Sequence, residues 1–271
     1  MKMQTALEDS LIDIGTMVHD QHVVMLIDRG LCDGSAFISK NGWQTLLDEL
    51  STNMIQLRES RYDAIVHMVT AADGAESFYD FESNVARWNT AQESVGIDKM
   101  LREAYMGHPG WFMIDNSSEC FDAKIAKTKT TVHHILGRSQ SGTNFYKKFL
   151  LKKGSPKLKT DTTVPIDLPA GQAYEESQVI ETFINYGSST GKVIESSIEK
   201  RGSKGHFTYI HKVTLEKHGQ RFQKKKAISA GDYIELGQAK LDHMKTLTAT
   251  RIVTIDGGLY IIIDYYPEVD G

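Results

Sequence analysis

The stretch Val23-Val24-Met25-Leu26-Ile27-Asp28-Arg29-Gly30 is an apolar run that ends in an acid. Such a run predicts a buried strand of the kind found in parallel sheets, which are covered on both faces. An acid at the carboxyl end of that strand faces the crevice where open α/β sheets bind ligands, and Arg29 could neutralise phosphate charge there. The alternative is that Asp28 only caps the next turn.

The residues ahead of this strand lack a phosphate-binding loop. In P-loop enzymes, an acid after the second apolar strand serves the magnesium shell while a glycine-rich loop cradles the phosphates. Residues 1–22 contain one glycine, Gly15, and no G-x-x-x-x-G-K-[ST]. We therefore expect a nucleotide-binding domain without its first strand and loop. Because loop amides supply most of the phosphate grip, its nucleotide affinity should be severely reduced.

Charge divides the chain into two halves. Residues 1–122 carry 20 acids and 8 bases, whereas residues 123–271 carry 15 acids and 23 bases, which gives −12 against +8. This division favours two domains, the second suited to phosphates or acidic lipid headgroups, although a basic surface can also be merely solvated. No apolar run reaches the roughly 18 residues of a membrane span, so we expect an intracellular protein without a transmembrane segment. Two cysteines, Cys32 and Cys120, are too few for a disulfide framework.

Apolar periodicity predicts helices that alternate with strands in the first half, as in a parallel α/β sheet. The predicted strands are 23–28, 64–69 and 111–115, and the predicted helices are 1–20, 43–50, 85–106 and 121–136. Gly137 is the expected C-cap of the last helix. The polar segment 73–109 is interpreted either as a mobile lid or as an ordinary crossover between two strands.

The pattern changes after a Gly/Ser/Thr/Asn-rich linker at 137–145. Runs of β-forming residues follow it, and one helix is predicted at 230–244. These runs are 149–151, 207–215, 250–255 and 259–266. Asp256-Gly257-Gly258 between the last two is a tight hairpin signal. The second half is therefore expected to be antiparallel and β-rich.

Several segments resemble a known family. The segments 24–39 (VMLIDRGLCDGSAFIS), 61–76 (RYDAIVHMVTAADGAE) and 107–117 (containing GHP and IDNS) look like the family of the fly photoreceptor TRPL translocation defect protein. The first domain of that family is similar to P-loop kinase-like ATPases. The segments 201–211 (RGSKGHFTYIH) and 259–266 (LYIIIDYY) resemble its second domain, which has the CYTH, or triphosphate-tunnel, fold.

The resemblance implies a fold class of α/β plus α+β. A P-loop-type parallel α/β domain without its first strand and phosphate loop is expected over residues 1–136. The linker 137–145 leads to a CYTH-like antiparallel barrel over residues 146–271. The chain ends at Gly271, soon after Asp264, where the resemblance implies a closing acidic strand, so we expect a tunnel open on one side and a sequence truncated at both ends.

The family role implied is membrane-protein trafficking in the cytoplasm, with peripheral attachment to membranes. Guanine nucleotide with Mg²⁺ would bind the first domain, with Asp28 as the magnesium-shell acid and Arg29 and Arg87 as phosphate contacts. In this chain GTP binding is expected to be weak or lost, and no cofactor at all is the alternative. Phosphatidic acid or phosphoinositide would bind the second domain. Nucleic acid is not an expected partner.

Two motifs of the tunnel fold are altered. Its first strand opens with E-x-E-x-K, whose glutamates hold the metal, and here Asn144 and Tyr146 stand in their places. Metal-assisted triphosphate hydrolysis is therefore not expected. Ser197 and Glu199 stand where an R-x-R pair lines the tunnel, which leaves Arg201 as the base on that alternating face.

The remaining basic residues of the second half are the candidates for an anion or lipid-phosphate site. They are Lys148, Arg201, Lys204, Lys212, Arg221 and Arg251. Lys148, Arg201, Lys212 and Arg251 are expected to point inward, where a charge is costly unless a ligand or an acid pairs it. The alternative is that several lie on the outer face. Lys224-Lys225-Lys226 is interpreted as an edge that discourages strand pairing.

These observations favour a non-catalytic binding module that recognises anionic phospholipid through its second domain. The alternative is an enzyme, a nucleoside or nucleotide kinase or another NTPase of the P-loop class. No arrangement of Ser, His and Asp or of Cys and His suggests another catalytic chemistry.

Overall fold

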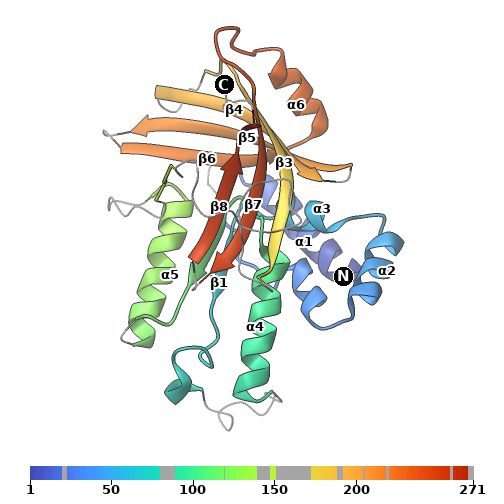
Figure 1. The fold of residues 1–271 in the computed structure, drawn as a ribbon, viewed down its shortest axis with the longest axis vertical. Helices are drawn as coiled ribbons and strands as arrows, with labels where there is room; N and C mark the ends of the chain where they lie inside the picture. The colour runs from blue at the N-terminus through green and yellow to red at the C-terminus, as the bar shows by residue number, and fades with distance from the viewer. Residues whose placement is uncertain are drawn as a thin grey trace.

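The computed structural model describes residues 1–19, 23–79, 89–118, 120–138, 147–150, 172–187, 192–203, 205–217, 220–256 and 259–267. Residues up to 138, the N-terminal region, contain helices and a small parallel sheet, and residues from 172 onward, the C-terminal region, contain a large antiparallel sheet (Figure 1). Mixed helix and strand content with these two sheets agrees with the expected combination of an α/β part and a β-rich part.

Helices dominate the N-terminal region. Its elements are α1 (Lys2–Thr16), η1 (Leu31–Ala36), α2 (Lys40–Glu49), α3 (Met54–Glu59), β1 (Ile65–Met68), η2 (Glu76–Phe78), α4 (Ala91–Tyr105), β2 (Trp111–Ile114) and α5 (Phe121–Ile135). Local sequence sets several boundaries: Thr90 and Glu93 form a capping box at the start of α4. After α5, Gly137 adopts φ +65°, and its amide donates to the carbonyl oxygen of His134, so it ends that helix as predicted.

Strands β1 and β2 pair in parallel, with Ile65 opposite Trp111 and Met68 opposite Ile114. Their core is completed by η1, α2 and α4, and its buried members include Leu31, Cys32 and Trp111. The predicted strands 64–69 and 111–115 are therefore confirmed.

The predicted strand 23–28 is wrong. These residues form no strand, and Val23 and Leu26 are 53% and 81% exposed. A strand exists only when a neighbouring backbone completes its hydrogen bonds, and residues 23–28 form no ladder with β1, which pairs only with β2 among the described residues. Residues 23–28 therefore have the composition of a β-strand but no hydrogen-bonded neighbouring strand.

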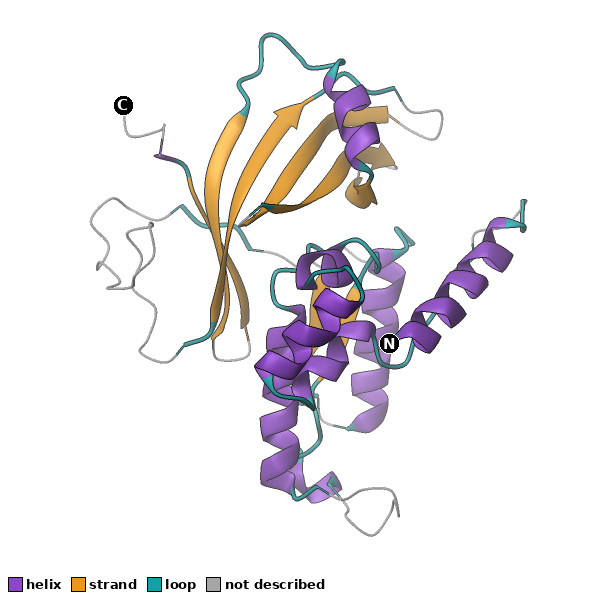
Figure 2. Ribbon diagram, turned by 90° about the vertical axis from the view of Figure 1, so that its right-hand side faces the viewer, coloured by secondary structure: helices purple, strands orange, loops and turns teal. Residues whose placement is uncertain are grey.

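The C-terminal region is a six-stranded antiparallel sheet in the order β6-β5-β4-β3-β7-β8. Its elements are β3 (Tyr174–Phe183), β4 (Lys192–Ser203), β5 (His206–Lys217), β6 (Gln220–Ile228), α6 (Ala230–Gly237), β7 (Leu247–Asp256) and β8 (Leu259–Tyr265). Figure 2 shows the sheet curled into a half-barrel that bends over the N-terminal region. Strands β6 and β8 lie at opposite edges and do not pair with each other, so the described sheet stays open.

Three predicted strands and one predicted hairpin of this region are present in the structure. The predicted strands 207–215, 250–255 and 259–266 are confirmed as β5, β7 and β8, and Asp256 and Leu259 pair at the predicted hairpin. The helix predicted at 230–244 ends at Gly237. Phe149 and Leu150 are exposed and not in a strand, and Leu151 lies outside the described residues. No helix of the described residues is long and apolar enough to cross a membrane.

Candidate functional site

One face of the antiparallel sheet gathers charged side chains from all six strands. Residues paired directly across an antiparallel ladder project to the same side, and side chains alternate along each strand. Glu181 pairs with Glu199, Lys212 pairs with Lys225, and Arg251 pairs with Asp264. We call this side, which also carries Ser197, Arg201 and Thr208, the charged face.

Glu199 lies at the centre of the charged face and is fully buried. The ammonium nitrogen of Lys212 is 2.5 Å from its Oε2 atom, and Arg251 Nη1 and Arg201 Nε are 3.4 Å and 3.9 Å from its Oε1 atom. Burial acts to raise the pKa of this carboxyl group, but Arg251, Lys212 and Arg201 lower it to about 2. Glu199 therefore stays ionised and neutralises part of the surrounding positive charge.

Two further acids complete the pairing on either side of Glu199. Glu181 accepts a hydrogen bond from Lys212 Nζ at 3.0 Å. Asp264 accepts two from Arg251, from Nε at 2.6 Å and from Nη2 at 2.9 Å, which is the bidentate geometry that guanidinium groups form with carboxylates. Lys212 and Arg251 are thus each held by two acids of the same sheet.

Arg201 receives its main partner from the N-terminal region. Glu59, the last residue of α3, places its carboxylate against the charged face, where both side chains are buried. Glu59 Oε2 accepts hydrogen bonds from Arg201 Nε at 3.0 Å, from Arg201 Nη2, and from Thr208 Oγ1 at 2.9 Å. Its Oε1 atom accepts from Arg58 Nη2 at 2.5 Å. Burial opposes ionisation, but Arg201 and Arg58 hold the pKa of Glu59 below its ordinary value.

Other contacts join the N-terminal and C-terminal regions around the Glu59 carboxylate. The Arg58 guanidinium pairs with Glu175 of β3, and the Gly107 amide donates to the Tyr260 hydroxyl at 2.8 Å. Gly107 has φ +100°, and a Cβ atom there would lie 2.9 Å from Arg58 Nη2, so a side chain would disrupt the junction. The rings of Trp111 and Tyr260 lie 4.7 Å apart.

Lys225 and His108 are two titratable groups at the same junction. Lys225 Nζ donates to the Pro109 carbonyl oxygen at 3.2 Å, and burial, with Lys212 nearby, lowers its pKa to about 8. Burial also lowers the pKa of His108 to about 4. The Gly110 amide donates to His108 Nδ1 at 2.9 Å, so the proton of the neutral ring is on Nε2, which donates to the Tyr62 carbonyl oxygen at 2.9 Å.

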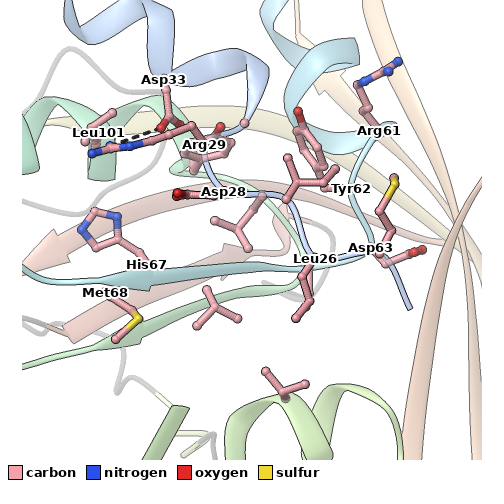
Figure 3. A pocket seen from close by; sticks show the side chains of 18 of the residues that line it. Leu26, Asp28, Arg29, Asp33, Arg61, Tyr62, Asp63, His67, Met68 and Leu101 are labelled. Atoms are coloured by element: carbon pink, nitrogen blue, oxygen red, sulfur yellow. Dashed lines mark hydrogen bonds and ion pairs between the residues drawn. The ribbon is translucent and has the colours of Figure 1, made fainter. Parts of the chain in front are cut away.

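The N-terminal region holds a cavity of about 1210 Å³ between residues 23–30 and β1. This exceeds the ~300–1,000 Å³ of common small-molecule pockets. Figure 3 shows Asp28, His67 and the paired Arg29 and Asp33 around it. Arg29 Nη1 is 3.4 Å from Asp33 Oδ2, and Arg29 adopts a left-handed backbone with φ +72°. Asp28 is exposed on the wall of this cavity.

One wall of the cavity is the free edge of β1. The Ile65 amide donates to Gly110 at 2.9 Å and the Val69 amide to Ile114 at 3.0 Å. Alternation turns the amides of Val66 and Met68 the other way, towards residues 23–28. No described residue pairs with β1 on that side. The cavity is therefore roomy and mostly apolar, and two of the carboxylates that line it, those of Asp28 and Asp63, form no hydrogen bond or ion pair with the described residues.

The magnesium site implied by the resemblance stays a prediction. Mg²⁺ in phosphate-binding sites is held by one or two carboxylates together with phosphate oxygens and waters. Asp28 provides one carboxylate, but the neighbouring Asp33 is engaged with Arg29. In the part of the chain that the structure describes, no group of three or more His, Cys, Asp or Glu side chains is placed to hold a metal ion.

The structure brings three of the predicted anion-site residues together: Arg201, Lys212 and Arg251 share the charged face. Lys148 and Arg221 are exposed and stand apart from its ion pairs. Arg87 and Lys204 lie outside the described residues. A binding role for any of these residues stays a prediction.

Sequence reasoning missed the acids that pair these bases, and it missed Lys225 as an inward residue. In Lys224-Lys225-Lys226, strand alternation places the middle residue opposite to its neighbours, so this signal was present in the sequence. The position of Glu59 had no such signal, because its partner Arg201 is 142 residues away along the chain.

Comparison of the chain with protein-family models, curated proteins and solved structures finds no match.

Proposed function

We propose that this protein is a non-catalytic binding module that recognises the phosphate groups of anionic phospholipids, phosphatidic acid or phosphoinositide, in membrane trafficking. The binding site is the charged face, on a sheet that we interpret as a CYTH-like half-barrel. The N-terminal region is interpreted as a P-loop-type domain with impaired binding of guanine nucleotide. The resemblance of residues 24–39, 61–76 and 201–211 supports this assignment.

One observation carries the proposal: the charged face already receives an anion from another part of the chain. Arg201 and Thr208 donate to one oxygen of Glu59, and Arg58 donates to the other. A phosphate oxygen is bound by the same charge-assisted donors, and guanidinium is well suited to both groups. Lys212, Lys225 and Arg251 add three more cationic groups to this face.

The acids of the charged face support binding rather than hydrolysis. Glu181, Glu199 and Asp264 are each engaged by an ammonium or a guanidinium group. A metal ion needs carboxylate oxygens that are free to coordinate it, and these oxygens are held by cations instead. This favours recognition of phosphate without metal-assisted cleavage.

The test is co-sedimentation with vesicles of phosphatidylcholine that contain or lack phosphatidic acid. We expect the protein to pellet with the phosphatidic acid vesicles, and Lys212→Gln to reduce the bound fraction several-fold. Lys224→Gln is the matched control, because Lys224 is exposed and lies on the opposite side of the sheet. Equal pelleting with both vesicles, or equal losses of binding in both variants, would contradict the proposal. A non-specific attraction to the membrane surface would be weakened by about 1 kcal/mol when either lysine is replaced.

The N-terminal cavity favours a second candidate function, weak nucleotide binding, since it is large and has Asp28 and Arg29 on its wall. The P-loop kinase or NTPase alternative needs backbone amides that surround phosphates. Isothermal titration with GTP and Mg²⁺ tests it. We expect no micromolar binding, and a micromolar dissociation constant that Asp28→Asn abolishes would establish the nucleotide site.

A further inference from the structure

We infer that Glu59 is an internal competitor of the ligand, a carboxylate that occupies the phosphate position at Arg201 until a phosphate group displaces it. This inference rests on the proposed function and adds regulation to the same site. The ligand is a phosphate-bearing anion, which comes from either a lipid headgroup or a soluble polyphosphate.

Glu59 is bound as a ligand would be bound. Its carboxylate comes from α3 and enters a face built by β3–β8, where it accepts hydrogen bonds from Arg201, Thr208 and Arg58. Glu59 and Arg201 are 4% and 3% exposed, so no phosphate can reach Arg201 while this acid is in place. Occupation by Glu59 and occupation by a phosphate therefore exclude each other.

Arg201 depends on Glu59 more than the other two bases depend on it. Lys212 lies within 3.0 Å of both Glu181 and Glu199, and Arg251 has the bidentate Asp264. Among the ion pairs of the described residues, the only sheet carboxylate near Arg201 is that of Glu199, at 3.9 Å. Without Glu59, Arg201 would be a buried cation without a close counter-ion, which is costly. An incoming phosphate would supply that missing charge.

Displacement of Glu59 also requires the two regions to separate locally. The contacts that must open with it are Arg58 with Glu175, the Gly107 amide with the Tyr260 hydroxyl, and Lys225 Nζ with the Pro109 carbonyl oxygen. These are polar contacts that a ligand or water can replace, so the junction between the two regions can open when a phosphate binds. Ligand binding and the docking of α3 are coupled because they use one site.

The experiment compares wild type with Glu59→Gln, which keeps the shape of the side chain and removes its charge. Binding is measured in two arms, with phosphatidic acid vesicles and with inorganic tripolyphosphate. We expect Glu59→Gln to bind at least tenfold more tightly than wild type in one arm or both. Tighter binding in either arm supports the inference, and the arm identifies whether the phosphate comes from lipid or from solution.

Glu195→Gln is the matched control, because it removes one negative charge from an exposed position of β4. An equal gain in this control would overturn the inference, since it would show a general effect of net charge. Wild-type binding that Lys212→Gln weakens and Glu59→Gln leaves unchanged would also overturn it, while the proposed function would stand. If neither wild type nor Glu59→Gln binds phosphate in either arm, the proposed function fails as well.

Tyr260→Phe provides a second variant that keeps every charge and retains the ring against Trp111. It removes the hydroxyl that accepts from the Gly107 amide at 2.8 Å and donates to the His108 carbonyl oxygen at 3.4 Å, and so it weakens the junction by one ordinary hydrogen bond and one long one. We expect affinity for the same anion to rise about three- to tenfold. Unchanged affinity in this variant would contradict the coupling of ligand binding to docking, even if Glu59→Gln failed to fold.

Discussion

The N-terminal cavity and the charged face differ in two properties, the open volume that a ligand could enter and the basic groups that could bind it. The N-terminal cavity has a volume of about 1210 Å³, but its two arginines are paired with acids, Arg29 with Asp33 and Arg61 with Glu8. The charged face has four bases from four strands, yet its centre is filled by Glu199 and by Glu59 from α3. A cluster of bases is therefore not by itself an open anion site. What decides is whether the acids that hold the bases can leave.

Glu199→Gln would break the charged face most severely. It removes the buried charge shared by Lys212, Arg251 and Arg201 and leaves three bases with fewer counter-ions. We expect the free energy of unfolding to fall by about 3–5 kcal/mol, as is usual when one partner of a buried ion pair is removed. Urea denaturation measures it, with the exposed Glu195→Gln expected within about 0.5 kcal/mol of wild type. A loss below about 1 kcal/mol for Glu199→Gln would show that the network does not organise this face.

His108 makes the junction between the two regions sensitive to acid. Its folded-state pKa is about 4, below the ordinary value near 6.5, because it is buried and neutral. The unfolded chain therefore binds a proton first, and stability present above pH 6.5 is lost as the pH falls towards 4, by on the order of 3 kcal/mol. Relative to wild type, His108→Gln should show a flatter loss of unfolding free energy between pH 6.5 and 4. Parallel pH profiles for the two proteins would contradict this role.

Lys225→Met should stabilise the protein at neutral pH. The folded-state pKa of Lys225 is about 8, so the protonated lysine weakens the folded state below pH 8. This penalty disappears as the pH rises from 8 to the unfolded value near 10.4, and so wild-type stability should rise over that range. We expect a gain of about 2 kcal/mol for the variant at pH 7, discounted for partial exposure of the side chain. The gain should vanish near pH 10.5, and a variant less stable than wild type at pH 7 would refute this reading.

Asp28→Asn should have the smallest effect, which would sharpen the contrast between the regions. Asp28 is exposed on the cavity wall, and its carboxylate forms no hydrogen bond or ion pair with the described residues. Its replacement should change the free energy of unfolding by less than about 0.5 kcal/mol. Thermal or urea denaturation at pH 7 measures this. A loss above 1 kcal/mol would mean that Asp28 supports the fold rather than facing a ligand.

Sequence patterns predicted the elements whose apolar residues face a core. Strands β1, β2, β5, β7 and β8 were predicted close to their observed bounds. Apolar patterns did not predict β3, β4 or β6, although the resemblance implied a strand through Ser197, Glu199 and Arg201. In β4 these three residues occupy buried positions that an alternating strand normally gives to apolar residues. The prediction for residues 23–28 failed in the opposite way: they have the apolar composition of a strand, but they pair with no described strand, although one edge of β1 is open towards them.

The sequence predicted the bases of the candidate site but not the acids that pair with them, for a related reason. Alternation along strands places Arg201, Lys212 and Arg251 on one face, which sequence can show once the strands are known. The acids that neutralise them lie on other strands or, for Glu59, on a distant helix. Such long-range pairing depends on the register and docking of whole elements, which single-sequence patterns do not contain.

The most direct test of the central claim, that a phosphate replaces Glu59 on the charged face, is the hydrogen exchange of the Gly107 amide in wild-type protein. This amide is hydrogen-bonded to the Tyr260 hydroxyl across the junction, so its exchange rate reports on the docking of the two regions. We predict faster exchange when phosphatidic acid vesicles are added, and no change with phosphatidylcholine vesicles. Binding of phosphatidic acid with unchanged or slower exchange of Gly107 would contradict the account.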